Sequence, residues 1–249
     1  MRILFSNLGY ATGINGTLRH HAGKILRHAF QTKAMQHKIL AQFNNIIEAT
    51  NPDLVCLVEL DQGSIHSSYF NQIKALVSAQ YPVFDIADKY GPNSQLSGML
   101  FHRGKSNGFL AKRPQTFERL YFKNGTKRLI YKIDLWPNLT LFFAHFSLTR
   151  TIRAKQFIEM KRLVEATNGD VMVFGDFNTL TGLTELKPLI EDDILTLLNK
   201  PDSPTFQFHR WHHTLDLCLV SPALARQCRL DVIPQSFSDH EALLLTVVV

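Results

Sequence analysis

Four short apolar runs along the chain each end in a side chain that can bind a metal ion or form strong hydrogen bonds. The runs have the composition of β-strands. The side chains that follow them are Asn7, Glu59, His145, Asp176 and, two residues further on, Asn178. In open α/β structures ligands bind outside the carboxyl ends of strands, so these five side chains are expected to converge on one edge although they span most of the sequence.

Further acidic residues and a histidine occur near the end of the sequence. Asp216 opens a predicted strand, and Asp239 and His240 occupy the turn before the last apolar run. An Asn or Asp after a strand is by itself an ordinary turn former or helix cap. A carboxylate, an amide, an imidazole and several more acids at strand ends are together hard to explain as turn chemistry, and they favour a catalytic site.

Composition and length indicate a globular protein with a sizeable core. The chain has 249 residues, of which 45% are hydrophobic and 19% charged, so the signature of disorder is absent. We found no repeat and no low-complexity linker, and we expect a single domain over residues 1–249.

No apolar run approaches the ~18 residues of a membrane span, and the N-terminus lacks a signal-peptide pattern. The three cysteines form no Cys-x-x-Cys motif, which favours reduced thiols and a cytoplasmic location.

Basic residues are concentrated near the N-terminus. The formal net charge is +6, and residues 1–47 contain no acidic side chain. Within this segment Arg19, Lys24 and Arg27 follow the first predicted strand closely enough to lie near its carboxyl end. A polyanionic partner is therefore plausible, although five cations on one helix are also often a solvated face.

Predicted strands outnumber predicted helices. The helical spacings are residues 35–47 and 157–164. The predicted strands are Ile3–Ser6, Leu54–Val58, Val83–Ala87, Gly98–Phe101, Leu129–Ile133, Leu139–Ala144, Val171–Phe174, Leu217–Val220 and Ala242–Val249. This ratio argues against a simple alternating doubly wound sheet and favours an α+β protein with two stacked sheets flanked by helices.

The ordered motifs resemble the endonuclease/exonuclease/phosphatase superfamily. The resemblance runs from Ile3 to Val249. It is carried by the strand ending in Asn7, Leu57-Val58-Glu59, Ala144-His145-Phe146-Ser147-Leu148, Gly175-Asp176-Phe177-Asn178, Leu215-Asp216-Leu217 and Ser238-Asp239-His240. Val58 and Leu217 depart from the residues that the family often has there. No mid-chain Tyr or Arg stands out as the phosphate-binding residue that some members use.

The resemblance implies a DNase I-like four-layer α/β/β/α sandwich of two packed mixed sheets, and a metal-dependent phosphoesterase. It makes Glu59 the main ligand of one Mg²⁺, replaceable by Mn²⁺, with Asn7 and Asp239 nearby, and Mg²⁺ does favour such oxygen ligands. Asp176 would hold and deprotonate the attacking water, while Asn178 and His145 would donate to phosphoryl oxygens. His240 and Asp216 form an imidazole–carboxylate pair. Whether Asp176 or His240 is the general base stays open.

The substrate is less defined than the bond that is broken. The basic segment, and Trp211 beside Arg210 and three histidines, favour nucleic acid and in particular DNA, with Trp211 stacking on a base. A phospholipid phosphodiesterase of the sphingomyelinase type, or a phosphoinositide phosphatase on an anionic membrane, is the alternative. A catalytically inactive anion-binding module is a third possibility, disfavoured by the presence of Glu59, Asp176 and His240. We expect a monomer.

Overall fold

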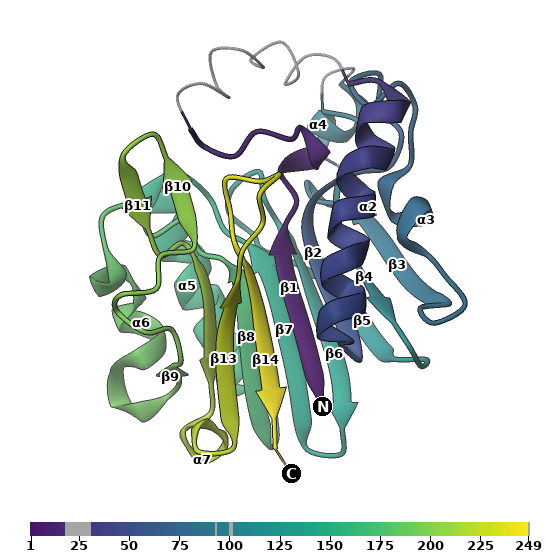
Figure 1. The fold of residues 1–249 in the computed structure, drawn as a ribbon. Coiled ribbons are helices and arrows are strands. Elements are labelled where there is room, and N and C mark those ends of the chain that lie inside the picture. The colour runs from purple at the N-terminus through teal and green to yellow at the C-terminus, as the bar shows by residue number, and fades with distance from the viewer. Residues whose placement is uncertain (18–30, 93, 100–101, 249) are drawn as a thin grey trace.

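The computed structural model describes residues 1–17, 31–92, 94–99 and 102–248, which form two mixed six-stranded sheets packed face to face (Figure 1). The first sheet has the order β13-β14-β1-β2-β4-β3. Its strands are β1 (Arg2–Asn7), β2 (Leu54–Asp61), β3 (Val83–Asp88), β4 (Lys105–Ala111), β13 (Cys228–Ile233) and β14 (Ala242–Val247).

The second sheet has the order β5-β6-β7-β8-β12-β9. Its strands are β5 (Thr116–Tyr121), β6 (Leu129–Trp136), β7 (Leu139–His145), β8 (Asp170–Asp176), β9 (Thr196–Leu197) and β12 (Asp216–Val220). A separate two-stranded hairpin, β10 (Phe206–Phe208) with β11 (Trp211–His213), lies beside the sheets at the upper left of Figure 1.

Helices cover the outer face of each sheet. The longer ones are α2 (Lys33–Thr50), on the first sheet, and α5 (Arg150–Glu165), on the second (Figure 1). The shorter helices are α3 (Gln72–Leu76), α4 (Gln95–Gly98), α6 (Lys187–Ile190) and α7 (Pro222–Ala225), with 3₁₀ turns η1 (Gly9–Ala11), η3 (Leu183–Leu186) and η4 (Glu191–Asp193). The predicted four-layer α/β/β/α sandwich is confirmed.

Three apolar clusters hold the four layers together. One lies between the sheets and includes Phe5, Phe109, Tyr131, Phe143 and Phe174, all fully buried. A second lies under α2 and a third under α5. Burial on both faces explains why the central strands are nearly continuous apolar runs, and it leaves the strand ends as the places where polar side chains can gather.

The two central βαβ units set the direction of the site. Strands β1 and β2 are parallel and are joined through α2, and β7 and β8 are parallel and are joined through α5. In register, Asn7 lies opposite Val58, and His145 lies opposite Asp176. The carboxyl ends of all four strands therefore reach the same end of the sandwich, as the sequence predicts.

One predicted strand is wrong in its described part. Gly98 ends helix α4, and Met99 is the C-cap of that helix. The Ser94 hydroxyl accepts a hydrogen bond from the Leu96 N–H at 3.3 Å, so a capped helical turn forms where the apolar run predicted a strand. Residues 100 and 101 lie outside the described residues.

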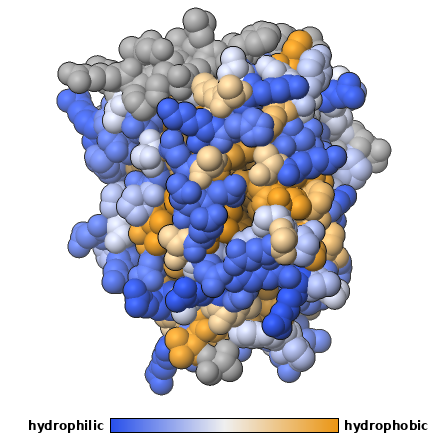
Figure 2. Space-filling view, turned by 45° about the vertical axis from the view of Figure 1, so that its right-hand side comes forward, coloured by the Kyte–Doolittle hydropathy of each residue, from blue (hydrophilic) through white to orange (hydrophobic). Residues whose placement is uncertain are grey.

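The surface shows no extended apolar face in the view of Figure 2, where hydrophobic atoms appear between hydrophilic ones. Some aromatic side chains, such as Tyr69 and Phe84, are exposed, which is common on protein surfaces. None of the described helices is long and apolar enough to cross a bilayer.

Candidate active site

A cavity of about 590 Å³ lies at the carboxyl ends of the four central strands. Most of the side chains predicted from the sequence line it, namely Asn7, Glu59, His145, Asp176, Asn178, Asp239, His240 and Trp211. Asp216 lies directly behind His240 and is fully buried. Arg19, Lys24 and Arg27 lie outside the described residues.

Asp176 is the centre of the hydrogen-bond network. Its Oδ2 accepts a hydrogen bond from Asn7 Nδ2 at 3.0 Å and lies 3.1 Å from His145 Nε2, while its Oδ1 accepts one from the Asn178 N–H at 3.1 Å. Burial alone would raise the pKa of Asp176, but the imidazoles of His145 and His240 outweigh it and hold this pKa below its usual range. Asp176 is therefore an ionised carboxylate, fixed in place at the end of β8.

His240 and Asp216 form the predicted imidazole–carboxylate pair. His240 Nδ1 lies 2.7 Å from Asp216 Oδ2, and His240 Nε2 lies 4.0 Å from Asp176 Oδ2. Burial lowers the pKa of His240, but Asp216 and Asp176 raise it more strongly, to about 10. Burial raises the pKa of Asp216 to about 6, against the influence of His240. Between these values the pair is an imidazolium bound to a carboxylate.

The β10–β11 hairpin and its neighbours hold this pair from the outside. The Thr205 hydroxyl accepts hydrogen bonds from the N–H groups of Leu215 and Asp216, at 3.0 and 2.8 Å. Phe206 packs its ring 4.8 Å from that of His240. Gly16 lies so close to the hairpin that a Cβ there would sit 1.9 Å from the Gln207 carbonyl oxygen, so only glycine fits.

Asn7 connects the two sheets and has a fixed orientation. Because a carboxylate only accepts hydrogen bonds, the amide nitrogen of Asn7 must face Asp176. Its Oδ1 is then turned the other way and accepts a hydrogen bond from the Gly9 N–H at 3.0 Å. That oxygen keeps a second lone pair, which can bind a metal ion.

Glu59 lies in a β-bulge inside β2, whereas the sequence placed it just after the strand. The pairing of β2 with β4 shifts register between Leu57 and Leu60, and Glu59 has a positive φ of 56°. The bulge turns the Glu59 side chain into the cavity, where its Oε1 lies 3.8 Å from His145 Nδ1. Burial raises the pKa of Glu59, but His145, Lys89 and Lys127 together lower it below the usual value.

The donor set of this half suits a hard divalent cation. Glu59 and Asp239 offer carboxylate oxygens and Asn7 an amide oxygen, which are the ligand types that Mg²⁺ and Mn²⁺ prefer. Burial and the charge of Glu59 raise the pKa of Asp239, so the two carboxylates repel each other, and a bound cation would relieve that repulsion. Asp176, Asp216 and His240 also place ligand atoms within 4.8 Å of one another, but the short hydrogen bond within the His240–Asp216 pair already occupies two of them.

Lys127, which precedes β6, is a site residue that the sequence did not reveal. It lines the cavity, and its ammonium contacts His145 Nε2. Burial lowers the pKa of Lys127, and burial together with this lysine lowers the pKa of His145 to about 4, so His145 is neutral. Lys127 thus places a cation at the cavity. The sequence showed no mid-chain Tyr or Arg for this role. Only its position before a predicted strand could have pointed to it.

Two buried side chains of α5 fix the loops that carry these groups. Arg153 donates hydrogen bonds to the carbonyl oxygens of Ser147 and Leu148, both at 2.9 Å, and pairs with Glu185 at 2.6 Å. Gln156 accepts a hydrogen bond from the Ser147 N–H and donates to the Lys127 carbonyl oxygen, both at 2.8 Å. Helix α5 therefore ties together the segments after β7, before β6 and around η3.

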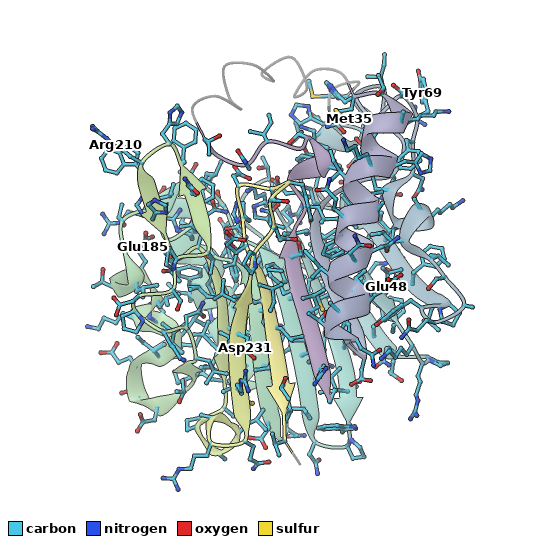
Figure 3. All side chains as sticks on the ribbon, in the orientation of Figure 1. Met35, Glu48, Tyr69, Glu185, Arg210 and Asp231 are labelled. Atoms are coloured by element: carbon cyan, nitrogen blue, oxygen red, sulfur yellow. The ribbon has the colours of Figure 1, made fainter. Side chains whose placement is uncertain are left out.

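Part of the lining of the cavity is apolar and aromatic. It is formed by Leu148, Leu180, Phe206, Phe208 and Trp211. Trp211 is 59% exposed, and the guanidinium of Arg210, at the tip of the hairpin (Figure 3), lies 6.0 Å from the centre of its ring. The cavity thus combines a charged floor with a surface suited to a flat apolar group.

Comparison with known proteins identifies the family. Residues 38–240 match the model of the Endonuclease/Exonuclease/phosphatase family. The chain belongs to this family. Its members are metal-dependent phosphoesterases, so the chain is a hydrolase of phosphate ester bonds.

Solved structures of low sequence identity share the fold. TDP2 from Caenorhabditis elegans superposes with a TM-score of 0.64 at 16% identity, covering 100% of this chain and 74% of that one. The human nocturnin catalytic domain, with a bound sulfate anion, gives 0.62 at 16% identity, covering 98% and 93%. The Bacteroides thetaiotaomicron mannosyl-6-phosphatase gives 0.62 at 12% identity, covering 100% of both chains. No curated protein sequence matches the chain.

Proposed function

We propose that the protein is a Mg²⁺-dependent phosphodiesterase that hydrolyses nucleic acid, with DNA as the favoured substrate. The observation that carries the proposal is the cavity itself. The same cavity is lined by Glu59, Asp176, His240 and Lys127, which can bind a phosphate, and by Trp211, whose ring can contact the group attached to that phosphate.

Different side chains of the protein have different roles in the attack on phosphorus. Asp176 is ionised and fixed, so it orients the attacking water and accepts its proton. The imidazolium of His240 and the ammonium of Lys127 donate to phosphoryl oxygens as negative charge grows there. Glu59, Asn7 and Asp239 would hold Mg²⁺, which supplies Lewis-acid polarisation of the phosphate. Asn178 is proposed as a further phosphoryl donor. The sequence predicted the same role for His145, but a neutral His145 directs its one N–H at Asp176, so we propose instead that it positions Asp176 and separates it from Glu59.

The aromatic wall favours a base or another flat group over a lipid chain. Base stacking on an exposed Trp tolerates any sequence and contributes ~1–3 kcal/mol per base. The basic residues Arg19, Lys24 and Arg27 are proposed to contact flanking phosphates, as the sequence suggested.

A hydrolysis panel tests the proposal. Duplex DNA, single-stranded DNA, RNA, sphingomyelin vesicles and phosphoinositides are each incubated with Mg²⁺, Mn²⁺ or EDTA. We expect metal-dependent cleavage of DNA that EDTA abolishes. Glu59→Gln should lose activity at low Mg²⁺ and regain part of it at about tenfold or higher Mg²⁺, because a ligand and not the base has been removed. Full activity in EDTA would refute the metal dependence, and cleavage of lipids alone would refute the nuclease.

A further inference from the structure

Two lysines beside the metal-binding half of the site surround the ring of Tyr10. Lys89 follows β3 and is only 6% exposed, and Lys105 opens β4. The Lys89 ammonium lies 5.1 Å from the centre of the Tyr10 ring, and the Lys105 ammonium lies 5.0 Å from it. Lys89 also contacts the Tyr10 hydroxyl and lies 5.5 Å from the centre of the Tyr90 ring.

These two ammonium groups lack a directly paired carboxylate. Within the described ranges, no carboxylate oxygen lies within 4.0 Å of Nζ of Lys89 or Lys105. Glu59 and Asp88 act on Lys89 only from further away, and burial lowers its pKa to about 7 in spite of them. A buried cation without a counter-ion is costly, so an anionic ligand at this place would be stabilising.

Tyr10 is fixed in a position to present a hydrogen-bond donor. Its carbonyl oxygen accepts a hydrogen bond from Gln72 Nε2 at 2.7 Å, which holds the residue in its left-handed conformation (φ 54°). Because the Lys89 ammonium donates to the phenolic oxygen, the phenol's own proton is directed elsewhere. Tyr10 and Lys105 are both partly exposed, so the group borders the surface of the protein.

Tyr10 and the two lysines lie beside the residues proposed to bind the metal. Tyr10 follows Asn7 by three residues, and Gly9 between them lies against Asp239, since a Cβ on Gly9 would sit 3.8 Å from Asp239 Oδ1. Glu59 acts electrostatically on both Tyr10 and Lys89. A substrate with one phosphate at Glu59 would therefore bring a neighbouring phosphate towards Tyr10.

We propose that Tyr10, Lys89 and Lys105 form a second phosphate subsite, which binds a substrate phosphate other than the one being hydrolysed. The inference rests on the proposed phosphodiesterase function and specifies its substrate as one with at least two phosphates. In a nucleic acid the second phosphate belongs to the adjacent nucleotide. In an inositol phosphate it would be a monoester on the same ring, and the chemistry of recognition is the same.

The test measures binding in EDTA, where hydrolysis does not interfere. The probes are the dinucleotide TpT, which has one phosphate, and its 5′- and 3′-phosphorylated forms. We expect at least one phosphorylated form to bind the wild type about 10- to 100-fold more tightly than TpT, as two charge-assisted hydrogen bonds would give. This gain should be lost in Lys89→Met/Lys105→Met, fall severalfold in Tyr10→Phe, and persist in the control Lys161→Met on α5.

A parallel comparison of inositol 1-phosphate with inositol 1,4-bisphosphate identifies the source of the second phosphate. A gain confined to the inositol pair would support the subsite and reassign the substrate. Equal binding of every mono- and bisphosphate probe, or a gain unchanged in the double variant, would overturn the subsite. Hydrolysis with Mg²⁺ is scored separately, so that an inactive wild type with a normal binding gain refutes the proposed function and leaves the subsite standing. Tyr10→Phe removes one hydroxyl and keeps the test valid if the double variant does not fold.

Discussion

The two sheets contribute different kinds of group to the one cavity. The second sheet brings Asp176 and Asp216, whose carboxylates are bound by Asn7, His145, Asn178 and His240 within the chain. The first sheet brings Glu59 and the two lysines beside Tyr10. Within the described residues the Glu59 carboxylate accepts no hydrogen bond, and its Oε1 lies 3.8 Å from His145 Nδ1. In the half around Asp176 and Asp216, the complete half, the carboxylates are paired within the chain except for Asp216 Oδ1, which has no hydrogen-bond partner among the described residues. The half around Glu59, the unpaired half, is charged but unpaired, as expected if its partners arrive from solution.

The largest effect on activity is expected when the central carboxylate of the complete half, Asp176, is removed. Asp176→Asn should lower kcat by about 10²- to 10⁴-fold, because it removes the proton acceptor. Added Mg²⁺ should not restore the activity, unlike the activity of Glu59→Gln. Steady-state kinetics at several Mg²⁺ concentrations check this, with Asp170→Asn at the opposite end of β8 as the control. Recovery of Asp176→Asn by metal would show that Asp176 acts mainly as a metal ligand.

The next effect concerns the support of the complete half by α5. Arg153→Met should lower the free energy of unfolding by about 3 kcal/mol, because it leaves Glu185 and the carbonyl oxygens of Ser147 and Leu148 without their partner. Urea denaturation measures the change. Arg162→Met, an exposed arginine on the same helix, should change it by less than about 0.5 kcal/mol. Equal effects of the two variants would contradict the role assigned to Arg153.

A smaller effect sharpens the role of the His240–Asp216 pair. Since the pKa of His240 is raised to about 10, the active imidazolium persists to alkaline pH and is lost as the pH rises through that value. Asp216→Asn removes the main group that raises this pKa, so the alkaline limb of kcat/KM should move to lower pH by more than about one unit. A pH–rate profile measures this, with exposed Asp202→Asn as the control. His240→Ala and the double variant His240→Ala/Asp216→Asn should be about equally inactive. Additive losses of activity would show that His240 and Asp216 are not partners.

The smallest effect lies on the aromatic wall. Trp211→Ala should raise KM for an oligonucleotide about tenfold and leave kcat nearly unchanged, because stacking binds the substrate without touching the reacting atoms. Trp136→Ala is the matched control, since Trp136 is also partly exposed but lies at the far end of β6. A fall in kcat with constant KM would show that Trp211 shapes the reaction centre instead.

Much of the complete half could be predicted from the sequence because its residues stand at the ends of strongly apolar strands. His145 and Asp176 are the last residues of β7 and β8, and Asp216 is the first of β12. Parallel strands joined by a helix bring such ends together without further information. The same reasoning placed Asn7 correctly.

The unpaired half depended on features without a sequence signal. The bulge that turns Glu59 inward arises from the pairing of β2 with β4, and β4 itself contains Gly108, whose missing side chain leaves room for the Asp85 carbonyl oxygen. Nothing in the sequence distinguishes Lys89, Lys105 and Lys127 from lysines on the surface of a protein. They become buried or clustered only when β3, β4 and β6 assemble. Half-exposed strands such as β5 and β13 also escaped prediction, since polar side chains interrupt their apolar runs.

The place of β14 in the first sheet has a consequence for how the protein is made. This strand pairs with β13 on one side and β1 on the other, yet it follows both in the chain, and the turn before it carries Asp239 and His240. During synthesis β1 must wait with an open edge until β14 emerges, and open edges invite pairing with other chains. The nascent protein is therefore inactive and most vulnerable to aggregation until this insertion, which joins β13 to β1 and completes the catalytic pair in one step.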